Sequence, residues 1–281
     1  MNRFFLFCMF VACLFQGCKQ NASTENGELA DDSDSTEMVD DDPTEDETDE
    51  LISEEPMPKA AEELFDDFFF NFASNKRLQK ERIAFPLLVH SHAKTDTLSR
   101  EDWHTDHFFM HNEEYTLIFD SEEQMSLVQD TSLEEAIVEK IFLGQGFVQQ
   151  YLFRKDNGRW MLVEIHKQTL SLNPNASFLA FYRRFVSDSV FQHQSLNEEI
   201  QFVGPDPDDE FNQMEGVITP DFWKAFAPEL PHDTIYNIVY GKRKSSGAEK
   251  IFVIRGISNG QEVVLTFHHE HDKWKLTKLM E

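Results

Sequence analysis

Cysteine is scarce in this sequence of 281 residues, and none occurs after position 18. The three cysteines are Cys8, Cys13 and Cys18, all in the first apolar stretch or at its end. Residues 19–281 can therefore form no disulfide, no thiolate metal site and no cysteine nucleophile. A chain without such supports is stabilised by its hydrophobic core, and its length is sufficient for one or two cores.

Basic residues are also scarce. The chain has 25 Lys and Arg against 52 Asp and Glu, which gives a formal net charge of −27. Basic residues do not gather into a patch at any point of the sequence. Because a nucleic-acid interface needs such a patch to neutralise phosphates, we expect no nucleic-acid partner.

The chain begins with an apolar run, Phe4–Phe15, that is too short to span a bilayer and that follows a basic residue, Arg3. This pattern predicts a signal peptide over residues 1–18. Its last residues, Leu14 to Cys18, resemble the lipobox of bacterial lipoproteins, in which the cysteine is acylated and becomes the first mature residue. We therefore expect a lipid on Cys18 that attaches the protein to a membrane of the cell envelope, the outer membrane in particular. An ordinary cleaved secretory signal is the alternative.

An acidic segment follows over residues 19–57. Between Lys19 and Glu55 it contains sixteen acidic residues and one lysine, with very few aliphatic residues. Such a segment cannot bury enough apolar surface to offset the entropy of ordering, and its charges repel one another. It is predicted to be a disordered, extended tether. An export or surface-sorting signal, or a cation-binding tail, is the alternative function.

A β-hairpin pattern occurs twice in the remainder of the chain. The first copy runs from Tyr151 to Leu162 and has two apolar arms around a polar tip at residues 156–158. The second copy runs from Leu265 to Leu276. The residues repeated at a constant offset of 114 are Phe153, Arg159 and Trp160, which recur as Phe267, Lys273 and Trp274.

A helical pattern rich in phenylalanine precedes each hairpin. The first is apolar at Leu64, Phe65, Phe68, Phe69 and Phe72, a spacing that places these side chains on one face, which we interpret as core rather than as a ligand box. The second copy of the helical pattern lies 113 residues later. It repeats Phe68, Phe72, Ser74 and Asn75 as Phe181, Phe185, Ser187 and Asp188, and Gln79 as Gln192.

These repeats predict an α+β fold made of two tandem domains, residues 58–174 and residues 175–281. Each is expected to contain an N-terminal helix followed by its own antiparallel sheet. Ser177 is the expected N-cap of the second helix. A strand is expected from Ile83 to Val89, with an interruption at Pro86.

The order of these elements resembles the NTF2-like fold, a curved, cone-shaped antiparallel sheet backed by a helix. From the lipobox and the acidic segment through Phe68–Gln79, the chain is also similar to a family of uncharacterised bacterial lipoproteins with this fold. The resemblance covers nearly the whole chain. It implies no activity, cofactor or catalytic residue, because the NTF2-like fold includes enzymes, binding modules and assembly domains alike.

Histidines cluster in three places, none of which has the spacing of a familiar metal site. The clusters are His90 with His92; His104 with His107 and His111; and His268, His269 and His271 around Glu270. The last cluster lies at a hairpin tip, where solvent exposure and alternating direction separate the rings. There is also no glycine-rich phosphate loop and no GxSxG motif. We therefore expect neither a metal nor a cofactor.

One acid–base pair remains as a candidate ligand pocket. In the strand from Trp160 onward, alternation places Trp160, Glu164 and His166 on one face. An acid and an imidazole beside a tryptophan would line the mouth of a cone and exchange a proton. The alternative is an amphipathic strand whose polar end faces water. The matching positions in the second copy are Lys278 and Met280, which offer no such pair.

Together these features predict a lipid-anchored envelope protein that binds a small ligand or another envelope protein and is not an enzyme. The alternative is a hydrolase or isomerase with an acid–base site in the cone of the first domain. A deep pocket with a buried carboxylate and histidine would favour the enzyme. Cones filled by Phe and Met would favour a binding or structural role.

Overall fold

The computed structural model describes residues 63–206, 209–241 and 247–281, which belong to one compact unit that begins at Pro56. The expected signal peptide, Cys18 and the acidic tether lie outside the described residues. Within the described part, no helix is both long and apolar enough to cross a membrane.

The first half contains short helices followed by strands and then by a long hairpin. Its elements are α1 (Phe65–Ser74), α2 (Lys76–Glu81), β1 (Ile83–His90), β2 (Thr95–Leu98), β3 (Glu114–Phe119), the 3₁₀ helix η1 (Glu122–Gln129), β4 (Glu135–Phe142), β5 (Phe147–Asp156), β6 (Arg159–Thr169) and η2 (Leu170–Leu172). The strand expected from Ile83 to Val89 is confirmed as β1. It continues past Pro86, and its pairing with β6 is irregular between Ile83 and Leu88.

The second half follows the same order. Its elements are α3 (Ala176–Ser187), α4 (Ser189–Gln194), β7 (Leu196–Asp206), β8 (Asp209–Ile218), α5 (Trp223–Phe226), β9 (Thr234–Tyr240), β10 (Glu249–Gly256), β11 (Glu262–Glu270) and β12 (Lys273–Met280). The N-cap of α3 is Asn175 rather than the expected Ser177, which lies inside the helix.

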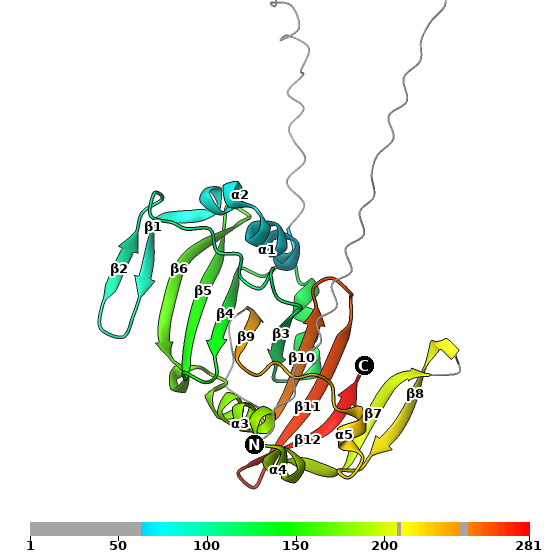
Figure 1. The fold of residues 1–281 in the computed structure, drawn as a ribbon. Coiled ribbons are helices and arrows are strands. Elements are labelled where there is room, and N and C mark those ends of the chain that lie inside the picture. Colours follow the sequence, from blue (N-terminus) through cyan, green and yellow to red (C-terminus); the bar gives the residue numbers. More distant parts are fainter. Residues whose placement is uncertain (1–62, 207–208, 242–246) are drawn as a thin grey trace, which may run out of the picture. The chain divides into compact units, whose positions relative to one another are not determined.

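The strands of both halves form one sheet of twelve strands, so the expectation of a separate sheet in each half is wrong. The strand order is β2-β1-β6-β5-β4-β9-β3-β10-β11-β12-β7-β8. The halves exchange one strand each at the centre, where the orange β9 lies between the green strands β4 and β3 (Figure 1). The sheet is also mixed rather than antiparallel, because β1 with β6, β3 with β9, and β7 with β12 are parallel pairs. The fold class is α+β.

The central strands are buried on both faces. Successive side chains of a strand point to opposite sides, so each of these strands contributes to two cores. In β10, Ile251 and Val253 join the core under α1, whereas Phe252 and Ile254 join the core under α3. This explains why the central strands are almost continuous apolar runs. Each core therefore contains strands of both halves.

The same pair of side-chain hydrogen bonds occurs after the first helix of each half. Gln79 donates its amide to the carbonyl of Phe72 at 3.0 Å and accepts from the Trp103 indole at 3.1 Å. In the second half, Gln192 donates to the carbonyl of Phe185 at 3.1 Å and accepts from the Trp223 indole at 3.2 Å. The bonds join the end of the first helix to the segment before the central strand, which is a loop at Trp103 and α5 at Trp223.

Both predicted hairpins are confirmed. The β5–β6 turn has positive φ at Asn157 and Gly158 (51° and 77°), and the β11–β12 turn has positive φ at His271 and Asp272 (48° and 62°). Such two-residue turns match the right-handed twist of the flanking strands. The hairpin tryptophans are buried, with Trp160 0% and Trp274 7% exposed.

Replacing Trp160 by Ala should lower the free energy of unfolding by about 3 kcal/mol or more, because the change leaves a cavity in a dense aromatic core. The Trp160 ring lies 5.0 Å from the Phe65 ring, and its indole donates to the carbonyl of Glu63 at 3.0 Å. Urea denaturation measures the loss. Phe222→Ala, at a 66% exposed position, is the control and should change stability by less than about 0.5 kcal/mol. Equal effects of the two substitutions would contradict the core assignment.

Candidate functional site

Glu164 and His166 lie on β6, but on the face opposite Trp160. The β5–β6 pairing shifts between Leu152↔Glu164 and Phe153↔Leu162, so that Val163 is an extra residue in β6. Such a bulge reverses the alternation of side chains beyond it. Trp160 points into the core under α1, whereas Glu164 and His166 remain partly exposed. The predicted common face of all three residues is therefore wrong.

The structure adds His90 to the pair. β1 lies parallel to β6, and the register places His90 beside His166 and Leu88 beside Glu164. The two rings are 4.7 Å apart between centroids. The sequence pattern groups His90 with His92 instead, because nothing local predicts that β1 and β6 are neighbours.

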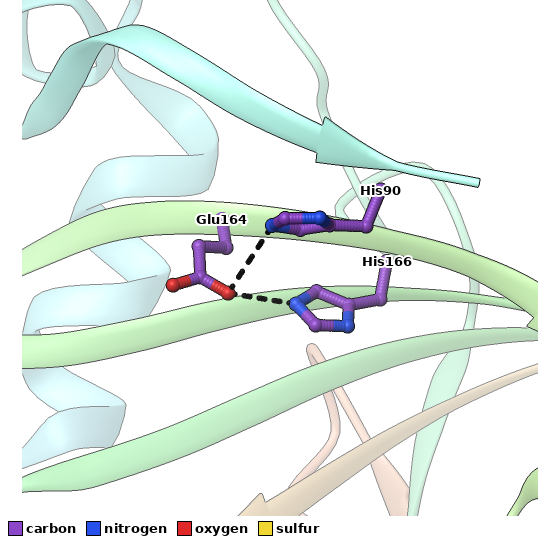
Figure 2. Close-up of side chains that lie close together, drawn as sticks. All are labelled: His90, Glu164 and His166. Carbon is purple, nitrogen blue, oxygen red and sulfur yellow. Dashed lines mark hydrogen bonds and ion pairs between the residues drawn. The ribbon is translucent and has the colours of Figure 1, made fainter. Parts of the chain in front are cut away.

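The rings of His90 and His166 both face one oxygen of the Glu164 carboxylate (Figure 2). His166 Nε2 lies 2.8 Å from Glu164 Oε2, and His90 Nε2 lies 3.6 Å from the same oxygen. The other carboxylate oxygen, Oε1, faces the Arg154 guanidinium at 3.6 Å. About a quarter to two fifths of each of the three side chains is exposed, so solvent and small solutes can reach the cluster.

The surroundings lower the pKa of the Glu164 carboxyl below its ordinary value. The hydrogen bond with His166 is the largest cause, partial burial opposes it, and the positive charge of Arg154 adds to the lowering. Glu164 is thus held as a carboxylate beside two imidazoles. Chemically, such a cluster can bind a cation or relay a proton.

The other histidine clusters do not converge in this way. His107 and His111 have rings 4.8 Å apart, and His268 contacts Glu249 at 2.9 Å. Among the residues that the structure describes, His90, Glu164 and His166 are the only three potential ligands whose donor atoms all lie within 4.8 Å of one another.

The interior of the first half is filled by aromatic side chains. The buried rings around α1 are those of Phe65, Phe68, Phe69, Phe72, Phe108, Phe109, Phe153 and Trp160. Beside them a hollow of about 400 Å³ opens between Trp103, Asp106 and Tyr151. There the Tyr151 hydroxyl donates to Asp106 Oδ2 at 2.5 Å. Burial, and then the neighbouring Asp106 carboxylate, raise the pKa of Tyr151.

Comparison with known proteins identifies a family but no activity. A family model described as a domain of unknown function, DUF4348, matches residues 44–281. The chain is 38% identical to an NTF2-like protein from Bacteroides fragilis NCTC 9343, with a TM-score of 0.72 between the structures. That match covers 80% of this chain and 98% of the other chain. No curated protein matches.

In metal-free buffer, the Glu164 carboxyl should titrate below its ordinary value of 4.5, because the carboxylate form accepts the His166 hydrogen bond. Replacing His166 by Ala should raise the midpoint, since it removes the largest cause of the lowering. The side-chain carbon-13 shift of Glu164 measures both. A wild-type midpoint at or above 4.5, or one unchanged by His166→Ala, would contradict the hydrogen bond.

Proposed function

This chain belongs to the family described as a domain of unknown function, DUF4348, and we propose that it is a lipid-anchored cell-envelope protein that binds a ligand or another protein without catalysing a reaction. Its fold is NTF2-like. The observation that carries the proposal is the aromatic filling of the first half. Side chains of α1 occupy the interior in which an enzyme of this shape would need space for a substrate.

Of the two kinds of partner, a protein is favoured by the position of β8, which is an edge strand among the strands that the structure describes. Met214 and Val217 of β8 are 39% and 59% exposed, and Phe222 and Phe226 in the segment that follows are 66% and 40% exposed. An edge strand with unpaired backbone groups and exposed apolar side chains is a template on which another chain can add a strand.

A photo-crosslinking residue at position 217 or 222 should therefore form a protein adduct in intact cells of the source organism. Val190 on α4 is 65% exposed and gives a matched control position at which no adduct is expected. Immunoblotting of irradiated cells detects the adducts. Equal labelling at position 190, or none at 217 and 222, would remove this edge as the binding surface.

The anchor part of the proposal rests on Cys18, which follows the signal-like apolar run. Replacing Cys18 by Ala should move the protein from the membrane fraction to the soluble fraction, because the acyl chains supply the apolar area that inserts into lipid. Ultracentrifugation in high salt, with the unmodified chain as control, measures the partition. A variant that stays wholly in the membrane pellet would place the anchor elsewhere.

We further propose that the two halves are copies of one NTF2-like unit that exchange a central strand. When each strand is replaced by its counterpart in the other half, the same strand order results, read from the opposite edge of the sheet. The matched hydrogen bonds of Gln79 and Gln192 support the same conclusion.

One observation favours the alternative of a hydrolase or isomerase in the first cone. Asp106 and Tyr151 form an acid–phenol pair at the hollow beside Trp103. In this pair Tyr151 is the hydrogen-bond donor rather than a base. The aromatic filling of the interior still weighs against a substrate site in the first half. The binding role is therefore the better supported function.

A further inference from the structure

We propose that His90, Glu164 and His166 form a binding site for one divalent transition-metal ion of the zinc class on the outward face of β1 and β6. The site is independent of the β8 edge and of the anchor. The metal ion would be a ligand of defined chemistry. The family to which the chain belongs is described without any ligand.

The separations of the donor atoms suit such an ion. Zinc binds imidazole nitrogen at about 2.0–2.1 Å and carboxylate oxygen at about 2.0–2.2 Å, so neighbouring ligand atoms of a tetrahedral site lie roughly 3.3 Å apart. The distances from Glu164 Oε2 are 2.8 Å to His166 Nε2 and 3.6 Å to His90 Nε2. They lie on either side of that value, and small side-chain rotations suffice to admit the ion.

A second layer of contacts orients two of the three ligands. His90 Nδ1 lies 3.0 Å from the hydroxyl oxygen of Thr95, which faces His90 across the β1–β2 pair. When Nδ1 donates its proton to this oxygen, Nε2 keeps its lone pair for a metal, as is usual for ligating histidines. Arg154 lies against the far carboxylate oxygen, Oε1, and leaves Oε2 directed at the two rings.

The backbone holds the ligands in place before an ion arrives. β1 and β6 are hydrogen-bonded neighbours, with His90 directly beside His166. Alternation in β6 places Glu164 on the same side as His166, and the bulge at Val163 turns both away from the face of Trp160. Sites on paired strands are more precise than sites on loops, and less ordering entropy is lost on binding.

Two imidazoles and one carboxylate favour zinc and its neighbours cobalt, nickel and copper over magnesium and calcium, which prefer oxygen ligands. Three protein ligands also leave a coordination position open for water or for a group of a bound molecule.

The second half of the chain offers an internal comparison. β12 and β7 pair in the same parallel manner, with Lys278 beside Gln201 and Met280 beside Val203. Lys278, Met280 and Val203 thus stand where the first half has Glu164, His166 and His90. An ammonium and two apolar side chains cannot form this site, so one ion per chain is expected.

The test is zinc titration of residues 19–281 by calorimetry in excess magnesium, which occupies the acidic segment but competes poorly for imidazoles. One zinc ion should bind per chain. His90→Gln, His166→Gln and Glu164→Gln should each weaken binding by more than about 100-fold, because loss of a supporting contact alone costs about 10- to 100-fold. Thr95→Val, which changes no ligand, should weaken it by about 10-fold.

The matched control is the double variant His107→Gln with His111→Gln, which removes two exposed histidines whose rings are as close as those of the site. It should leave zinc affinity unchanged. Circular dichroism confirms that each variant is folded. Zinc binding that survives all three ligand substitutions, or that the control variant abolishes, would overturn the proposal, as would wild-type protein that binds no zinc in excess magnesium.

Discussion

The pairing of β3 with β9 at the centre of the sheet is the constraint on which the rest of the structure depends. These strands come from different halves, and their neighbours β4 and β10 are buried, so polar groups at the centre need partners within the protein. Glu139 of β4 accepts hydrogen bonds from Asn173, Asn237 and Gln150. Since a shift by one residue would turn Asn237 to the other face, its bond with Glu139 fixes the register of β9 against β4.

A second buried charge acts in the same way on β10. Lys250 is 1% exposed, and its ammonium contacts Asp120 after β3 and Asn175 before α3. These contacts join residues 130 and 75 positions apart in the sequence. Because strands of each half complete the core of the other, either half alone would expose an unpaired edge and part of an apolar core. The two halves are therefore expected to fold as one unit rather than as independent domains.

Local features of this fold could be predicted from the sequence, and non-local ones could not. The phenylalanine spacing of α1 and the turn at Asn157-Gly158 determine their elements through contacts close in the chain. The exchange of β3 and β9 leaves no such mark, because an apolar strand fits either half equally well. The site at His90 was missed for the same reason, since its ligands meet only through the parallel pairing of β1 and β6.

The bulge at Val163 explains how one strand contributes both to the core and to a surface site. The second half has the same irregularity, since Thr266↔Lys278 and Phe267↔Leu276 leave Thr277 as an extra residue. Inward positions carry similar residues in both halves, namely Phe153 and Phe267, Trp160 and Trp274, and Leu162 and Leu276. Packing constrains these side chains. Of the outward positions after the bulge, Glu164 and His166 lie outside both cores, whereas Met280 of the second half packs against the core under α1. In the first half, the outward positions can therefore carry a polar cluster without disturbing the cores.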